Sequence, residues 1–210
     1  MFTNETMKYR KIGLLLFVTG TLSICTYLLL ARNTKILPSM ALTNPITRSI
    51  GDKVDSFNNV YVYYNGSIGH VLERNISKDG YNLGLKFQCV EFVKRYYYQY
   101  YNHKMPDSYG HAKDFFNKHL NDGALNKGRN LRQFSNPSLT KPKIGDIIVF
   151  DGHAFNPYGH VAIISAVSNE NIEIIQQNPG PTAPSRELLS LTKIGNQYEI
   201  EDGLGWLGKR

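Results

Sequence analysis

Cys89 is the residue of this chain best suited to act as a nucleophile. The apolar residues that follow it are spaced by three and four, as on one face of an α-helix (92, 93, 96, 97 and 100), so Cys89 lies at a predicted helix start. Unpaired N–H groups at that end favour a thiolate, but the helix dipole lowers a thiol pKa by only about 1.5 pH units. A nucleophilic role therefore also needs a histidine. The alternative is a small buried apolar side chain.

His160 is the strongest candidate among six histidines. It follows Gly159 and opens the apolar run 161–164, so it lies at a predicted strand start, where the backbone is rigid and the side chain can face a cleft. His153, in the preceding loop, is the reserve candidate. A structural role for His160 stays open from position alone. Polar neighbours indicate solvated surface groups for three others: His103, His111 and His119.

Three segments around these residues resemble the signature blocks of the CHAP family, the cysteine, histidine-dependent amidohydrolases/peptidases. In chain order they read FQCVEFV (87–93), PKIGDIIVF (142–150) and GHVAII (159–164). Within the family, the resemblance is closest to the amidase domain of the bifunctional glutathionylspermidine synthetase/amidase type. That domain shares a later Gln-Asn pair, here 177–178, and a Leu-Gly-Trp ending, here 204–206. The resemblance covers roughly residues 57 to 206.

The resemblance implies a thiol-dependent mechanism. His160 would take the thiol proton, the Cys89 thiolate would attack an amide carbonyl, and water would hydrolyse the resulting thioester. The backbone N–H of Cys89 and the side chain of Gln88 would hold the oxyanion. Gln88 could equally serve as a helix-cap partner. Asp146 is expected to position loops, and Glu91 is expected to pair with Lys94 or Arg95 without a catalytic role.

The third member of the site departs from the family pattern. Amidase relatives place a Glu sixteen residues after the histidine, where this chain has Gln176. A neutral amide can fix the imidazole tautomer but brings no charge to stabilise imidazolium, so we expect a weaker thiolate–imidazolium pair. Asn178 is the second candidate for this role. Lys94 aligns with an Arg that binds a substrate carboxylate in the relatives. A Lys supplies the positive charge but cannot form the two parallel hydrogen bonds of a guanidinium.

The expected fold is α+β: a papain-like CHAP domain with N-terminal helices packed on a C-terminal antiparallel β-sheet, preceded by one transmembrane helix. The helices are predicted from Cys89 onwards and over Ala112 to Leu120. Short β-branched runs bounded by Gly, Pro and Asn predict the strands. These runs cover residues 60–64, 146–150, 161–167, 172–175 and 198–200.

The N-terminal part carries the most apolar stretch of the chain. Residues 12–31 contain no charge over the roughly 20 residues that a helix needs to cross a bilayer. Basic residues before this stretch would keep the N-terminus in the cytoplasm and export the rest, although Arg32 and Lys35 weaken that orientation. We expect residues 1–35 to be an uncleaved anchor, 36–56 a linker and 57–210 the catalytic domain, in the periplasm or outside the cell. A cleaved signal peptide ending near Ala41 is the alternative.

Composition limits the partners. The net charge of +7 favours anionic surfaces such as lipid headgroups or cell-wall polymers. The basic residues are spread along the chain without a nucleic-acid-binding signature, so nucleic acid is not expected as a partner. The sequence indicates no cofactor, and the scattered histidines lack metal-ligand spacing. Of the two cysteines, Cys25 lies in the apolar stretch, so no internal disulfide is expected.

Three functions are compatible with these residues. The first is hydrolysis of peptidoglycan peptide amides, which fits an exported, positively charged protein. The second is a glutathionylspermidine-type amidase, which fits the closest resemblance. The third is a catalytically weak or inactive wall-binding module, which the neutral Gln176 keeps open.

Overall fold

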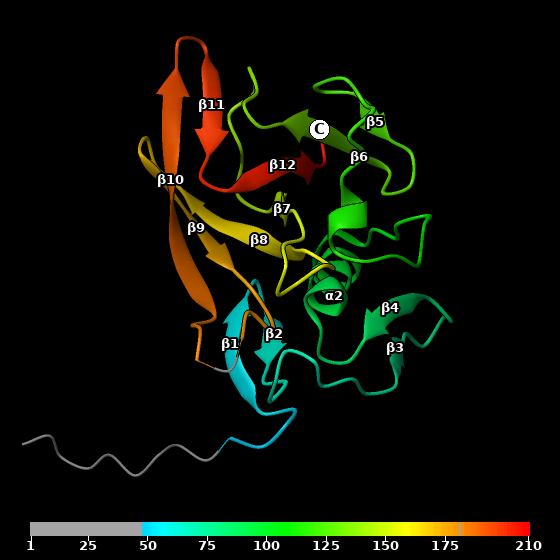
Figure 1. Ribbon diagram of the computed structural model, residues 1–210. Helices are drawn as coiled ribbons and strands as arrows, with labels where there is room; N and C mark the ends of the chain where they lie inside the picture. Colours follow the sequence, from blue (N-terminus) through cyan, green and yellow to red (C-terminus); the bar gives the residue numbers. More distant parts are fainter. Residues whose placement is uncertain (1–47, 181) are drawn as a thin grey trace, which may run out of the picture. The chain divides into compact units, whose positions relative to one another are not determined.

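The computed structural model describes residues 48–180 and 182–210, which are mostly β-structure (Figure 1). One α-helix, α2, spans Cys89–Tyr101, and one 3-10 helix, η1, spans Lys113–Phe115. Twelve strands complete the described part: β1 (Lys53–Phe57), β2 (Val60–Tyr63), β3 (Arg74–Ile76), β4 (Asn82–Leu85), β5 (Leu125–Asn126), β6 (Leu131–Ser135), β7 (Ile147–Phe150), β8 (His160–Val167), β9 (Asn171–Ile175), β10 (Arg186–Ile194), β11 (Gln197–Ile200) and β12 (Gly203–Gly208).

Eight of these strands form one antiparallel sheet in the order β11-β10-β9-β8-β7-β12-β6-β5. The pairs β1–β2 and β3–β4 are separate two-stranded hairpins. The sequence prediction of a C-terminal antiparallel sheet is confirmed. The helix starting at Cys89 and the five predicted strand runs also correspond to observed elements.

Alternate residues of the central strands fill two separate cores. Val161 and Ile163 of β8 pack with Phe92 and Tyr96 of α2 on one face of the sheet. Ala162 and Ile164 face the other side, where the core includes Trp206 and residues of β10 and β11. Side chains alternate between faces along a strand, so a strand covered on both faces reads as a continuous apolar run. This explains the run at 161–164 that marks the strand of His160.

The expected α+β architecture was wrong. The described residues contain one α-helix, and the stretch Ala112 to Leu120 forms only the short turn η1. Side chains there bind the backbone in place of helical partners: Asp114 accepts from the N–H of His111 at 2.8 Å, and Asn117 accepts from that of His119 at 3.0 Å. Asp and Asn compete with helical hydrogen bonds in this way. Phe116 has extended dihedrals, which ends the turn.

The predicted transmembrane helix over residues 12–31 lies outside the described residues. Within residues 48–180 and 182–210, no helix has the length and apolar character needed to cross a bilayer. The division into anchor, linker and domain stays a prediction. The described compact unit begins at Arg48, and β1 lies where the end of the linker was expected.

Candidate active site

Cys89 is the first residue of α2, and its thiol lies near the start of β8. Gln88 precedes it in extended conformation and forms the N-cap. The thiol is surrounded by protein, while part of the residue stays accessible. Burial raises the thiol pKa, and the backbone amides of Val161, Val90 and Cys89 itself oppose that rise. These amides form a preorganised environment for negative charge at the sulfur.

His160 begins β8, where it pairs with Phe150 of β7. The turn before it requires Gly159, which has φ +74° and would place a Cβ 2.5 Å from the carbonyl oxygen of Phe150. The amide of the next residue, Val161, interacts with the Cys89 thiol, so the start of α2 lies beside the start of β8, where His160 stands. Burial lowers the pKa of His160 to about 4, and the hydrogen bond with Gln176 acts in the opposite direction.

Gln176 holds the His160 ring in one tautomer. Its Oε1 lies 2.9 Å from the imidazole Nε2. The Gln176 Nε2 donates to the Pro184 carbonyl at 3.3 Å and to the Glu187 carboxylate at 3.1 Å, which fixes the amide with its oxygen towards the histidine. An amide oxygen only accepts, so the imidazole Nε2 carries the proton and Nδ1 stays free to accept one. A neutral base with a free Nδ1 is the form that can deprotonate a thiol.

Asn178 contacts Gln88, the predicted oxyanion donor, in this structure. Its Nδ2 donates to the Gln88 Oε1 at 2.8 Å and to the Ile68 carbonyl at 3.1 Å. The Gln88 Nε2 donates to the His70 carbonyl at 2.7 Å. The contacts thus assign the imidazole to Gln176 and the Gln88 amide to Asn178. Donation from Gln88 to an oxyanion stays a prediction and requires its bond to His70 to be shared or exchanged.

A buried network beside the nucleophile was missed by sequence reasoning. Glu91, fully buried, accepts from Arg95 at 2.6 Å, from Asn75 at 2.7 Å and from the Gln177 Nε2 at 2.8 Å. Gln177 also donates to the Gln88 carbonyl at 3.0 Å. The predicted pairing of Glu91 with Lys94 or Arg95 is confirmed for Arg95. The i,i+4 spacing of Glu91 and Arg95 was the available signal for their pairing. It could not predict that Gln177, which follows β9, joins α2 through Glu91.

Lys94, predicted to bind substrate, points into the protein interior. It is buried, and its Nζ donates to the carbonyls of Asn82 and of Ser108, the latter at 3.0 Å. Burial lowers the pKa of Lys94 to about 8. A role in substrate binding stays a prediction and would require the ammonium to leave these carbonyls.

The two remaining candidates, His153 and Asp146, form hydrogen bonds with residues of their own loops. The reserve base His153 lies in the β7–β8 loop, where its Nδ1 accepts from the N–H of Phe155 at 3.3 Å. Asp146 is buried, forms a bidentate ion pair with Arg210 at 2.8 and 2.6 Å, and accepts from the Lys143 N–H at 2.9 Å. It therefore positions a loop, as expected. In the described part of the chain, no group of three or more His, Cys, Asp or Glu side chains is arranged to hold a metal ion.

Comparison with known proteins identifies one family and several relatives. The model of the CHAP domain matches residues 78–178. The bifunctional glutathionylspermidine synthetase/amidase of Escherichia coli (strain K12) is 33% identical over 143 residues, covering 60% of this chain and 22% of that protein. Glutathionylspermidine synthase of Crithidia fasciculata is 29% identical over 137 residues, covering 60% and 19%. The chain thus spans about a fifth of the length of these relatives.

One solved structure is also similar in part. "The crystal structure of Ly7917" aligns with a TM-score of 0.38 and 16% identity, covering 69% of this chain and 56% of that one.

Proposed function

Because residues 78–178 are a CHAP domain, homologous to the amidase domain of bifunctional glutathionylspermidine synthetase/amidase, we propose that this protein hydrolyses amide bonds through an acyl-enzyme on Cys89. The observation that carries the proposal is the tautomer of His160. The hydrogen bond from its Nε2 to Gln176 leaves Nδ1 unprotonated, and the backbone amide of the next residue, Val161, interacts with the Cys89 thiol at the helix N-terminus. This is the arrangement of a nucleophile with its general base.

The reaction follows from these positions. The His160 Nδ1 takes the thiol proton as the Cys89 sulfur attacks the amide carbonyl carbon, and the carbonyl π electrons move onto oxygen. The tetrahedral intermediate collapses as the C–N bond breaks and the imidazolium gives its proton to the leaving amine. Water, deprotonated by the same imidazole, then attacks the thioester and releases the carboxylic acid and the thiol. Gln176 keeps the ring in place throughout.

Neutral resting groups distinguish this site from a preformed ion pair. Burial raises the pKa of the Cys89 thiol and lowers the pKa of His160. Both groups are therefore uncharged before the reaction begins. Proton transfer creates two opposite charges side by side, and their attraction partly offsets both desolvation costs. Proton transfer is therefore coupled to attack, with the backbone amides at the sulfur stabilising the thiolate.

Peptidoglycan peptide amides are the substrate class that the charge favours. The net charge of +7 attracts an anionic wall polymer. A glutathionylspermidine-type amide is the alternative, supported by the curated relatives. Lys94 weakens that alternative, because it stands where such relatives are expected to carry a substrate-binding Arg and its ammonium binds backbone carbonyls.

The test incubates the full-length protein, and its Cys89→Ala variant, with purified sacculi and with glutathionylspermidine, and measures released amines. New amino groups with one substrate, together with an acyl adduct on Cys89 by mass spectrometry, would support the proposal and choose the substrate. Release that survives Cys89→Ala would contradict the thiol mechanism. No release from either substrate, with normal ligand binding, would favour an inactive binding module.

A further inference from the structure

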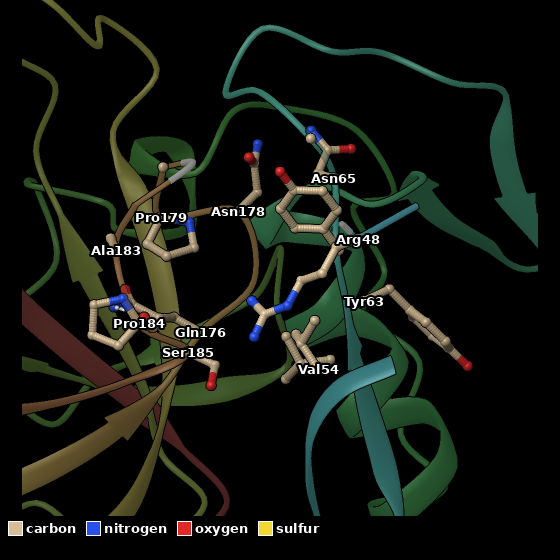
Figure 2. A pocket seen from close by; sticks show the side chains of 14 residues that line it. Arg48, Val54, Tyr63, Asn65, Gln176, Asn178, Pro179, Ala183, Pro184 and Ser185 are labelled. Atoms are coloured by element: carbon tan, nitrogen blue, oxygen red, sulfur yellow. Dashed lines mark hydrogen bonds between the residues drawn. The ribbon is translucent and has the colours of Figure 1, made fainter. Parts of the chain in front are cut away.

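A cavity of about 220 Å³ lies directly beside the candidate active site (Figure 2). Its walls come from the start of the described chain, the β1–β2 hairpin with the turn after it, and the segment between β9 and β10. The lining residues are Arg48, Val54, Val62, Tyr63, Tyr64, Asn65, Gly66, Gln176, Asn178, Pro179, Gly180, Ala183, Pro184 and Ser185. Two of them, Gln176 and Asn178, contact His160 and Gln88. The cavity thus shares a wall with the catalytic residues.

Arg48 gives this cavity a positive charge. Among the described residues that line the cavity, it is the only one with a formal charge at neutral pH, and none of the others is Asp, Glu or Lys. Figure 2 shows the Arg48 side chain extending across the cavity, with its guanidinium pointing towards Gln176 and Pro184. A guanidinium presents five N–H donors in a planar fork that matches a carboxylate.

Two other polar side chains of the cavity, Ser185 and Asn65, already have partners. The Ser185 hydroxyl donates to Asp55 at 2.8 Å, and the Asn65 amide donates to the Ser67 carbonyl at 2.8 Å. Asp55 itself forms an ion pair with Arg186 at 2.9 Å, so its charge is already compensated. Among the ion pairs of the described residues, none involves Arg48. The cavity therefore combines the Arg48 guanidinium with described lining residues that carry no negative charge.

We propose that this cavity binds a carboxylate group of the substrate, held by Arg48. Its volume lies below the roughly 300–1,000 Å³ of pockets for drug-sized ligands, so it suits the acidic end of one amino-acid residue. This assignment rests on the proposed amidase function and narrows it to acidic peptides. The cavity adjoins the candidate active site through Gln176, which lines the cavity and contacts His160.

Binding is tested without catalysis in the full-length Cys89→Ser protein. The probes are the thiol-free peptide γ-glutamyl-alanyl-glycine and its diamide, in which carboxamides replace both carboxylates, and NMR titration measures each dissociation constant. We expect the free acid to bind about tenfold more tightly than the diamide, as a charge-assisted hydrogen-bonded pair implies. Arg48→Gln should reduce that preference to about twofold, and Arg48→Lys should retain part of it.

Arg132→Gln is the matched control, because it removes the same charge from an exposed arginine of β6 outside the cavity. It should keep the tenfold preference, which separates a local site from general attraction to a basic protein. Equal preference in Arg48→Gln and Arg132→Gln would overturn the assignment, as would a protein that binds both peptides equally. Because the experiment measures binding in a protein without the Cys89 thiol, neither result depends on whether the hydrolysis test succeeds.

Discussion

Two consecutive glutamines directly after β9 have different surroundings. Gln176 contacts a neutral imidazole whose pKa burial lowers to about 4. Gln177, fully buried, contacts the ion pair of Glu91 and Arg95, in which each charge has a partner. Gln176 thus orients a base that has no counter-charge, whereas Gln177 binds an ion pair in which both charges are neutralised. The comparison indicates that the catalytic corner holds groups whose charges appear only in reaction, while the adjacent network secures α2.

The catalytic side of this comparison predicts the largest effect. His160→Ala removes the general base and should lower amide hydrolysis by about 10³-fold or more, measured as initial rates on the substrate that the full-length protein cleaves. The melting temperature should change little, because Gln176 keeps its hydrogen bonds to Pro184 and Glu187. A variant that unfolds would instead place His160 among the structural residues.

The structural side predicts a loss of stability. Glu91→Ala leaves the buried guanidinium of Arg95 without its counter-charge and should lower the free energy of unfolding by about 3–5 kcal/mol, measured by urea denaturation. The control is Glu73→Ala, which removes an exposed carboxylate paired with Lys86 and should leave stability essentially unchanged. Equal effects of the two substitutions would contradict the role given to the network.

The low pKa of His160 predicts a pH dependence of stability. The folded pKa of about 4 lies below the ordinary 6.5, so the unfolded chain binds more protons between these values. Stability should fall as pH falls from about 6.5 to 4, by up to about 3 kcal/mol from this residue. His160→Gln, which cannot titrate, should lose correspondingly less over that window in denaturation at each pH. Parallel curves for both proteins would show that the imidazole is not held neutral.

Replacing either glutamine by a glutamate predicts the smallest effect. The double variant Gln176→Glu with Glu187→Gln places a carboxylate beside His160 and keeps an amide behind it. It should raise the imidazole pKa and increase Cys89 alkylation near pH 6 by about tenfold. Gln177→Glu would instead place a second carboxylate beside Glu91 and should destabilise the fold without activating the thiol. Activation by Gln177→Glu would reverse the roles assigned to the two residues.

The sequence predicted the elements that carry the site better than the packing between them. The helix at Cys89 and the strand at His160 follow from local periodicity, and Gln176 was implied by the family resemblance, which places the third site residue sixteen positions after the histidine. The helix expected over 112–120 failed because Asp114 and Asn117 bind nearby backbone groups. The role of Gln177 could not be predicted, because it depends on the burial of Glu91, 86 residues earlier in the chain. The preference of Asn178 for Gln88 likewise depends on tertiary contacts.

The most direct test is the pH dependence of Cys89 alkylation by iodoacetamide in the full-length protein, compared with His160→Ala. Because His160 takes the thiol proton as the sulfur attacks, the account predicts labelling of the unaltered protein well below the ordinary thiol pKa of about 8.5. In His160→Ala, labelling at pH 7 should fall at least about tenfold and recover only at high pH, because burial raises the pKa of the isolated thiol. Labelling that follows an ordinary thiol, or that is the same in both proteins, would contradict the Cys89–His160 pair.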